Sequence, residues 1–253
     1  MSWDWIKNRL GQGRRRGTDM PVTELAPDTS FYAVGDIHGR LDLLQTLLSQ
    51  LDDDCPVVFV GDYVDRGDYS AQVLRQLRHL TDTSDGRVVC LLGNHEDMLL
   101  RFLEAPERAG RLWLTNGGLQ TLASFGVGAI PMLPTGDDAA RAATQLRAAM
   151  GEEFLTWLAN LPLTWASGNV TVVHAALDPR CPTGKQQRKT CLWGHPQFRN
   201  QSRRDGQWVV HGHTIVDEPR ISGGVISIDT GAFATDHLTA ARISKGGVHF
   251  TST

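Results

Sequence analysis

In the first hundred residues, short apolar runs alternate with longer segments in which apolar residues recur on one side. Runs of four or five apolar residues are typical of strands that are buried on both faces. They occur at Phe31–Val34, Val57–Val60 and Val88–Leu92. Leucine-rich segments with helical spacing follow them at Leu41–Leu51, Val73–Leu80 and Met98–Leu103. This alternation predicts β-α-β units with parallel strand pairing.

The pattern changes after the third helical segment. Trp113–Val127 contains an Asn-Gly-Gly turn and is predicted to be rich in loops. Asp137–Leu161 is predicted to be the longest helical region, interrupted near Met150 and Gly151. Short strands with glycine-rich connections are then expected at Val170–His174, Trp208–His211, Val225–Ile228 and Leu238–Ile243. They suit a second, mixed sheet that packs face to face on the first.

Each of the first three strands runs into a loop that begins with glycine and carries Asp, His or Asn. The loops read Gly-Asp-Ile-His-Gly-Arg at 35–40, Gly-Asp-Tyr-Val-Asp-Arg-Gly at 61–67 and Gly-Asn-His-Glu at 93–96. A single Gly-Asp pair is common in surface turns. Three such loops instead predict a site at the carboxyl edge of the sheet, where open α/β sheets bind ligands.

These loops, in this order, resemble the signature of the calcineurin-like metallophosphoesterases. The Val-Asp-Arg-Gly sequence at 64–67 narrows the resemblance to the phosphoprotein phosphatase branch, in its bacterial and phage form. Val-Val-His at 172–174 and Val-His-Gly-His-Thr at 210–214 continue it, so it spans residues 31–231. The resemblance implies an α/β fold, a four-layer α/β/β/α sandwich of two mixed sheets flanked by helices.

Carboxylates, imidazoles and an amide oxygen at the strand ends form a ligand set for a divalent metal. The candidates are Asp36, His38, Asp62, Asn94, His174 and His213. They suffice for two ions about 3.5–4 Å apart that share one carboxylate. The resemblance places Asp36 and His38 on one ion and Asn94, His174 and His213 on the other, with Asp62 bridging both. Manganese is the expected metal, with iron and zinc as alternatives.

The resemblance also implies roles for residues beside these ligands. Arg66 is expected to bind phosphoryl oxygens, because a planar guanidinium group meets them bidentately. His95 is the expected general acid, and Asp65 is the carboxylate that orients its ring.

Two features of the second half leave alternatives open. Related chains carry a second phosphate-binding arginine after a Leu-Trp pair, but here Leu192-Trp193 is followed by Gly-His-Pro. Arg199 is the expected substitute, with Arg203, Arg204 and His195 as alternatives. These residues belong to a basic segment at 180–204, which is either a solvated surface loop or a loop that faces the substrate. His211 lies two residues before His213 and is either a group behind the ligands or a satisfied core histidine.

Bulk properties add few constraints. Residues 29–253 are assigned to a single catalytic domain and residues 1–28 to a basic, flexible arm, with contact to a membrane surface as an alternative for the arm. The net charge of -3 gives no general attraction to nucleic acid, so no nucleic-acid partner is expected. Four cysteines without paired spacing, together with the lack of an export signal or a membrane-spanning run, predict a cytoplasmic protein.

These features predict a metal-dependent phosphomonoesterase that removes phosphate from phosphoserine and phosphothreonine in a phosphoprotein or phosphopeptide. The alternative is a hydrolase of dinucleoside polyphosphates such as diadenosine tetraphosphate, which is similar across the first three motifs. The Gly-His-Thr sequence at 212–214 and the Ile-Asp-Thr-Gly sequence at 228–231 are interpreted in favour of the protein phosphatase. A non-catalytic binding protein is least favoured, because all six ligands and His95 are present.

Overall fold

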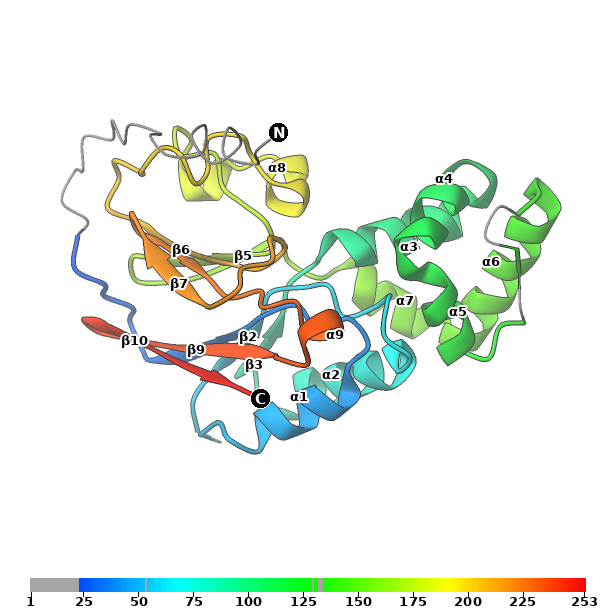
Figure 1. Cartoon of the computed structure of the whole chain (residues 1–253), viewed down its shortest axis with the longest axis horizontal. Helices are drawn as coiled ribbons and strands as arrows, with labels where there is room; N and C mark the ends of the chain where they lie inside the picture. The colour runs from blue at the N-terminus through cyan, green and yellow to red at the C-terminus, as the bar shows by residue number, and fades with distance from the viewer. Residues whose placement is uncertain (1–22, 53, 129, 132–133) are drawn as a thin grey trace, which may run out of the picture.

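Two five-stranded mixed sheets lie face to face in the computed structural model, which describes residues 23–52, 54–128, 130–131 and 134–253 (Figure 1). The first sheet has the order β10-β9-β1-β2-β3. Its strands are β1 (Phe31–Val34), β2 (Val57–Phe59), β3 (Val88–Cys90), β9 (Thr239–Ser244) and β10 (Gly247–Ser252). Strands β1, β2 and β3 pair in parallel, which confirms the prediction, and β9 pairs antiparallel with both β1 and β10.

The second sheet has the order β4-β5-β6-β8-β7. Its strands are β4 (Thr164–Ser167), β5 (Val170–Val173), β6 (Trp208–His211), β7 (Arg220–Ser222) and β8 (Val225–Ser227). The three central strands are parallel, and β4 and β7 add antiparallel edges. The sequence pattern did not predict β4, β7 or β10. β7 has three residues, all of them exposed, so it is too short to show an apolar run or a sustained alternation.

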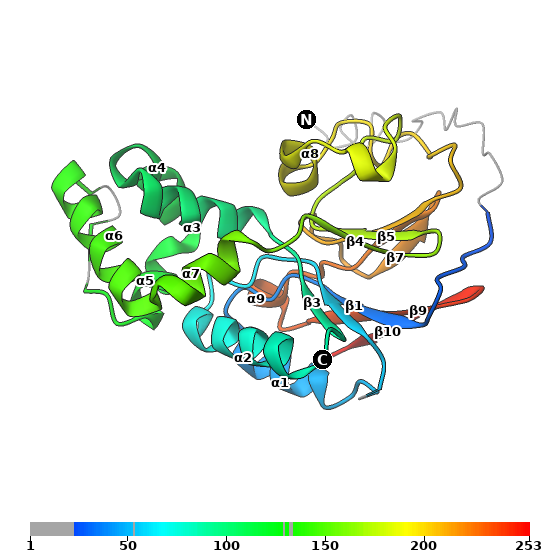
Figure 2. The same cartoon turned by 180° about the vertical axis from the view of Figure 1, so that it is seen from behind.

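The core explains why the strands of the first sheet are apolar on both faces. Phe31 and Val58 point toward the second sheet and join a cluster that includes Val172. Their neighbours in the strands point the other way, toward α1 (Leu41–Leu48) and α2 (Ser70–Thr83). Beyond the second sheet, α8 (Arg188–Trp193) contributes Cys191 to a third cluster. These layers form the predicted α/β/β/α sandwich, which Figure 2 shows from behind.

A helical region lies to one side of the sandwich (Figures 1 and 2). It comprises α3 (Asn94–Glu104), α4 (Pro106–Trp113), α5 (Leu119–Ser124), α6 (Gly136–Met150) and α7 (Glu152–Ala159). The predicted break between α6 and α7 is confirmed at Gly151, where φ is 80°. The prediction that Trp113–Val127 is rich in loops was wrong, because a π-helical turn at Leu114–Gly118 leads directly into α5. The Asn-Gly-Gly sequence only kinks this segment, at Gly117.

Most of the arm predicted at residues 1–28 lies outside the described residues. Its last part, Thr23 to Asp28, runs along the sandwich. The backbone N–H of Ala26 donates to Asn169 Oδ1 at 2.8 Å, and the N–H of Gly246 donates to the carbonyl of Leu25 at 2.8 Å. Among the described residues, no helix has both the length and the apolar character needed to cross a bilayer.

Candidate metal centre

The loops after β1, β2, β3, β5 and β6 bring the predicted ligands to one edge of the sandwich. Close contacts between these loops depend on glycine at two positions. A Cβ atom on Gly93 would lie less than 3.0 Å from Asp62 Oδ1, and one on Gly212 would lie less than 3.0 Å from Asp36 Oδ1. The glycines that mark these loops therefore let neighbouring backbones approach the carboxylates.

Five residues of this edge adopt left-handed backbone conformations although they carry side chains. They are His38, Asp62, Asp65, Arg66 and His213, with φ values between 47° and 72°. Such conformations are uncommon for residues other than glycine and concentrate at functional sites. They turn the chain sharply directly after the strands, so that side chains from separate loops converge.

Asp62 lies at the centre of the convergence and belongs to two groups of potential ligands. One group contains His38, Asp62 and His95, and the other contains Asp62, His174 and His213. The Asp62 oxygens lie 3.7 Å from His38 Nε2 and 3.4 Å from His174 Nε2. A carboxylate shared by two ligand groups is the arrangement needed for a bridging ligand.

The remaining two predicted ligands flank these groups. Asn94 Oδ1 lies 2.8 Å from both His174 Nε2 and His213 Nδ1. Asp36 is in neither group, but its carboxylate accepts a hydrogen bond from the backbone N–H of His213 at 3.0 Å. The structure therefore brings all six predicted ligands to one place, and their assignment to individual ions stays a prediction.

The hydrogen bonds of His174 indicate that this site suits a cation. His174 Nδ1 lies 3.1 Å from the carbonyl of Val60, so it carries the ring hydrogen. Burial lowers the pKa of His174 to about 4, so the ring is neutral near pH 7. Its Nε2 therefore has a lone pair that faces the amide oxygen of Asn94 at 2.8 Å. Two acceptors at this distance are satisfied by a positive ion that lies to one side and binds both.

The carboxylates around the site lead to the same conclusion. Asp36, Asp62, Asp229 and Glu96 are all buried. Burial, reinforced by the charges of Asp229 and Asp62, raises the pKa of Asp36 well above its usual value, and burial raises the pKa of Asp229 to about 6. Buried negative charge of this density is stabilised by bound cations. The donor set therefore fits divalent metal ions.

His95, Asp65 and Arg66 form a chain of contacts beside Asp62. His95 Nδ1 lies 2.6 Å from Asp65 Oδ2, so it donates to that carboxylate and leaves Nε2 facing the site. Although burial lowers it, the carboxylates of Asp62 and Asp65 raise the pKa of His95 above its ordinary value. Arg66 lies 3.3 Å from His95 Nε2 through Nη2 and donates to His38 Nε2 at 3.1 Å through Nη1. The Nε2 atom of His95 and the guanidinium group of Arg66 thus lie together beside Asp62.

Comparison with known proteins places this geometry in a family. The model of the calcineurin-like phosphoesterases matches residues 29–217, well over half of the chain. The chain belongs to the calcineurin-like phosphoesterase family. It is therefore a hydrolase of a family whose members hold a divalent metal centre, in agreement with the ligand groups around Asp62.

Curated relatives of this phosphoesterase carry a more specific name. The asymmetrical bis(5'-nucleosyl)-tetraphosphatase of Bacillus velezensis is 31% identical, over 85% of this chain and 90% of that protein. The symmetrical bis(5'-nucleosyl)-tetraphosphatase of Ralstonia nicotianae is 28% identical, over 89% and 92%. A serine/threonine phosphatase structure from Saccharomyces cerevisiae has the same fold, with a TM-score of 0.58, 14% identity and coverage of 89% of this chain and 80% of that one.

These relatives correct the expected substrate. The prediction of a serine/threonine protein phosphatase was wrong, because relatives over more than four fifths of the chain are named dinucleoside tetraphosphatases. The motifs interpreted in favour of a protein phosphatase supply His213 and Asp229, which both lie at the metal centre. Because both residues belong to the candidate metal centre, these motifs do not discriminate between the two substrate classes.

Two residues of the phosphoesterase site were missed by sequence reasoning. Glu96 accepts hydrogen bonds from the backbone N–H groups of Asp62 and Tyr63, both at 2.8 Å, and from that of Gly93 at 3.0 Å. Phe233, in α9 (Ala232–Thr235), lies under the guanidinium group of Arg66. The distance from Arg66 Cζ to the centroid of the Phe233 ring is 4.4 Å. The Gly-Asn-His-Glu motif contained Glu96, whereas no pattern pointed to Phe233.

Arg199 is not brought to the metal centre. It lines a groove with Arg220 and Ser227 over the outer face of the second sheet. His211 lies on that face too, where its Nε2 contacts Ser227 Oγ at 2.8 Å and its Nδ1 donates to the carbonyl of Gly212 at 2.8 Å. His211 is therefore a core histidine with both ring nitrogens hydrogen-bonded. It does not share the face of His213, because β6 ends at His211 and His213 follows in a left-handed turn.

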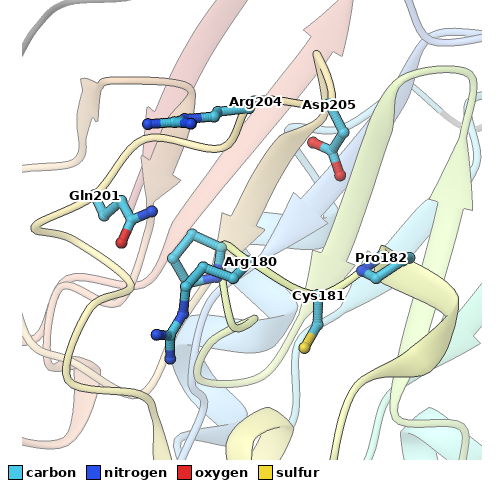
Figure 3. Close-up of a pocket in the computed structure, with 7 residues that line it drawn as sticks. Arg180, Cys181, Pro182, Gln201, Arg204 and Asp205 are labelled. Atoms are coloured by element: carbon cyan, nitrogen blue, oxygen red, sulfur yellow. The ribbon is translucent and has the colours of Figure 1, made fainter.

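The basic segment at 180–204 was expected to be a loop, but it contains the helix α8 and a 3₁₀ turn at Thr183–Lys185. A pocket of about 570 Å³ lies in it, with Arg180, Cys181, Gln201 and Arg204 in its walls (Figure 3). The predicted metal ligands do not line this pocket. Its side chains are therefore separate from the metal centre.

Proposed function

We propose that this phosphoesterase hydrolyses dinucleoside tetraphosphates, with diadenosine tetraphosphate as the representative substrate. The proposal is carried by the similarity over 85% of the chain to a relative named for this activity, combined with two ligand groups that share Asp62. Each phosphate of a dinucleoside polyphosphate has two non-bridging oxygens, one fewer than a phosphomonoester, and these can still bind metal ions and a guanidinium group. The site around Asp62 and Arg66 therefore suits a phosphoanhydride as well as a phosphomonoester.

The proposed reaction joins a water oxygen to one phosphorus and breaks the P–O bond to the next phosphate. Two divalent ions held by Asp36, His38, Asp62, Asn94, His174 and His213, for which we propose manganese, would lower the pKa of a bound water and polarise the phosphoryl group. Arg66 neutralises the charge that develops on the phosphoryl oxygens. The electron pair of the broken bond leaves with the departing nucleotide, and His95 donates a proton from Nε2 to that oxygen.

The position of Arg66 supports its role in this reaction. Its guanidinium group lies over the ring of Phe233, with Cζ 4.4 Å from the ring centroid. This contact restricts the rotation of the side chain and leaves its N–H groups available, so less side-chain entropy remains to be lost when a phosphate binds.

The test compares substrates after the metal has been stripped and manganese restored. We expect manganese-dependent hydrolysis of diadenosine tetraphosphate, lost in Asp62→Asn, and a far lower kcat/KM on a phosphothreonine peptide. Separation of the nucleotide products distinguishes cleavage to AMP and ATP from cleavage to two ADP. Asp217→Asn is the matched control, because Asp217 is exposed and lies outside the site. No turnover of diadenosine tetraphosphate by protein that hydrolyses p-nitrophenyl phosphate would overturn the proposal.

A further inference from the structure

A groove of about 470 Å³ lies between α3, α4 and α8. Its walls combine apolar, basic and acidic side chains. Leu100, Ala109 and Leu112 supply apolar surface, and Leu112 is 53% exposed. Positive charge comes from Arg101, Arg108 and Arg188, and negative charge from Asp97 and Glu104.

The groove begins close to the metal centre. Asn94 is the first residue of α3, and Asp97, which lines the groove, is one helical turn further along. Residues three apart lie on the same side of a helix, about 4.5 Å apart along its axis. An ion pair of 2.8 Å between Arg188 and Asp97 ties α8 to this turn. The wall of the groove at Asp97 therefore lies about one helical turn from the predicted ligand Asn94.

The charges in the groove are unequally neutralised. Asp97 pairs with Arg101 at 2.7 Å and with Arg188 at 2.8 Å, so one carboxylate serves two guanidinium groups. Arg108 forms no ion pair with any residue in the described part of the chain and is exposed. Three arginines thus face two carboxylates, Asp97 and Glu104, which leaves one positive charge in excess. An excess positive charge beside apolar surface suits a ligand that has both an anionic chain and a flat, largely apolar ring.

We propose that this groove holds the second nucleotide of a dinucleoside polyphosphate while a phosphate of the same molecule lies at the metal centre. The inference rests on the proposed function and adds a binding site to it. The arginines attract the polyphosphate chain, and the purine ring lies against Leu112 and Ala109. Guanidinium groups also stack on the faces of nucleobases, which gives Arg108 a second way to contribute.

The test is a charge reversal with a matched control on the same helix. Arg108→Glu changes the groove, whereas Arg111→Glu makes the same change at an exposed position of α4 that does not line it. KM and kcat are measured for diadenosine tetraphosphate and for p-nitrophenyl phosphate, which has no second nucleotide. We expect Arg108→Glu to raise KM for diadenosine tetraphosphate about tenfold, equivalent to about 1.4 kcal/mol, and to leave both constants for p-nitrophenyl phosphate within twofold.

A second variant, Leu112→Ala, tests the apolar wall and is expected to raise the same KM about threefold, a change typical of lost apolar contact. If Arg108→Glu and Arg111→Glu raise KM equally, the effect comes from the overall charge of the protein, and the proposal that the groove binds the second nucleotide is wrong. An unchanged KM in both Arg108→Glu and Leu112→Ala would overturn it as well. If the wild-type protein hydrolyses p-nitrophenyl phosphate but not diadenosine tetraphosphate, the proposed function itself fails, and the groove inference fails with it.

Discussion

The side chain of His95 depends on residues from three separate segments. Its partner Asp65 also accepts hydrogen bonds from Trp113 Nε1 at 3.0 Å and from Thr121 Oγ1 at 2.6 Å. Trp113 ends α4 and Thr121 lies in α5, so the helical region fixes the carboxylate that orients the imidazole. All these groups are buried, which holds the His95 ring in one tautomer and one direction.

The first prediction concerns His95→Asn. An alkoxide leaving group needs a proton far more than a departing nucleotide, whose terminal phosphate has a pKa of about 6. We therefore expect kcat to fall about 10²–10⁴-fold on an alkyl phosphate and clearly less on diadenosine tetraphosphate. The measurement is kcat for both substrates, with His79→Asn as the control because His79 is exposed on α2. Equal losses on the two substrates would show that His95 does not act as the acid for the leaving group.

The chemistry of single residues was predictable where it followed strand ends. Asp36, Asp62 and Asn94 each come directly after an apolar run and a glycine, and the structure brings them together as expected. Phe233 could not be found in this way. Its contact with Arg66 joins residues 167 positions apart and depends on the left-handed φ of 70° at Arg66.

At the scale of elements, the site depends on how α3 begins. Glu96 lies in the first turn of this helix, and its carboxylate accepts N–H groups from Asp62, Tyr63, Val64 and Gly93. Burial and the charge of Asp62 raise the pKa of Glu96 to about 8. One side chain thus ties the start of α3 to the loop that carries the shared carboxylate.

The second prediction is that Glu96→Ala lowers the free energy of unfolding by about 3 kcal/mol or more. The substitution leaves four backbone N–H groups without their acceptor, and each buried, unpaired group costs about 1–3 kcal/mol, part of which water can restore. The measurement is urea unfolding of the metal-free protein. Glu153→Ala, at an exposed position of α7, is the control and should stay within 0.5 kcal/mol of the wild type. A Glu96→Ala variant as stable as that control would contradict the role assigned to this carboxylate.

Helices and strands were predictable where packing against the core requires apolar residues at regular spacing, and less predictable elsewhere. The helices α1, α2, α6 and α7 present buried leucines and alanines at helical spacing, and all four were expected. The start of α3 was placed too late, at Met98 instead of Asn94, because its first turn consists of polar residues that are buried for the site. α5 was missed because the Asn-Gly-Gly sequence before it reads as a turn.

On the scale of the whole molecule, the two sheets and the helical region meet at the metal centre. Asp36, His38, Asp62 and Asn94 come from the first sheet's loops, and His174 and His213 come from the second sheet's. Ions bound between them cross-link layers that are otherwise joined by apolar packing. Metal binding should therefore stabilise the whole fold in addition to supplying catalysis.

The third prediction tests this coupling without any substrate. A ligand that binds only the folded state at 100 times its Kd adds about 2.7 kcal/mol of stability, which corresponds to roughly 5–10 °C in Tm for a chain of this size. We expect manganese to raise the Tm of the stripped protein by this amount. The increment should be lost in Asp62→Asn, which removes the shared carboxylate, and kept in Asp217→Asn. If Asp62→Asn gains as much as the wild type, the ions bind elsewhere. In that case Asp62 would not be the residue that joins the two ligand groups.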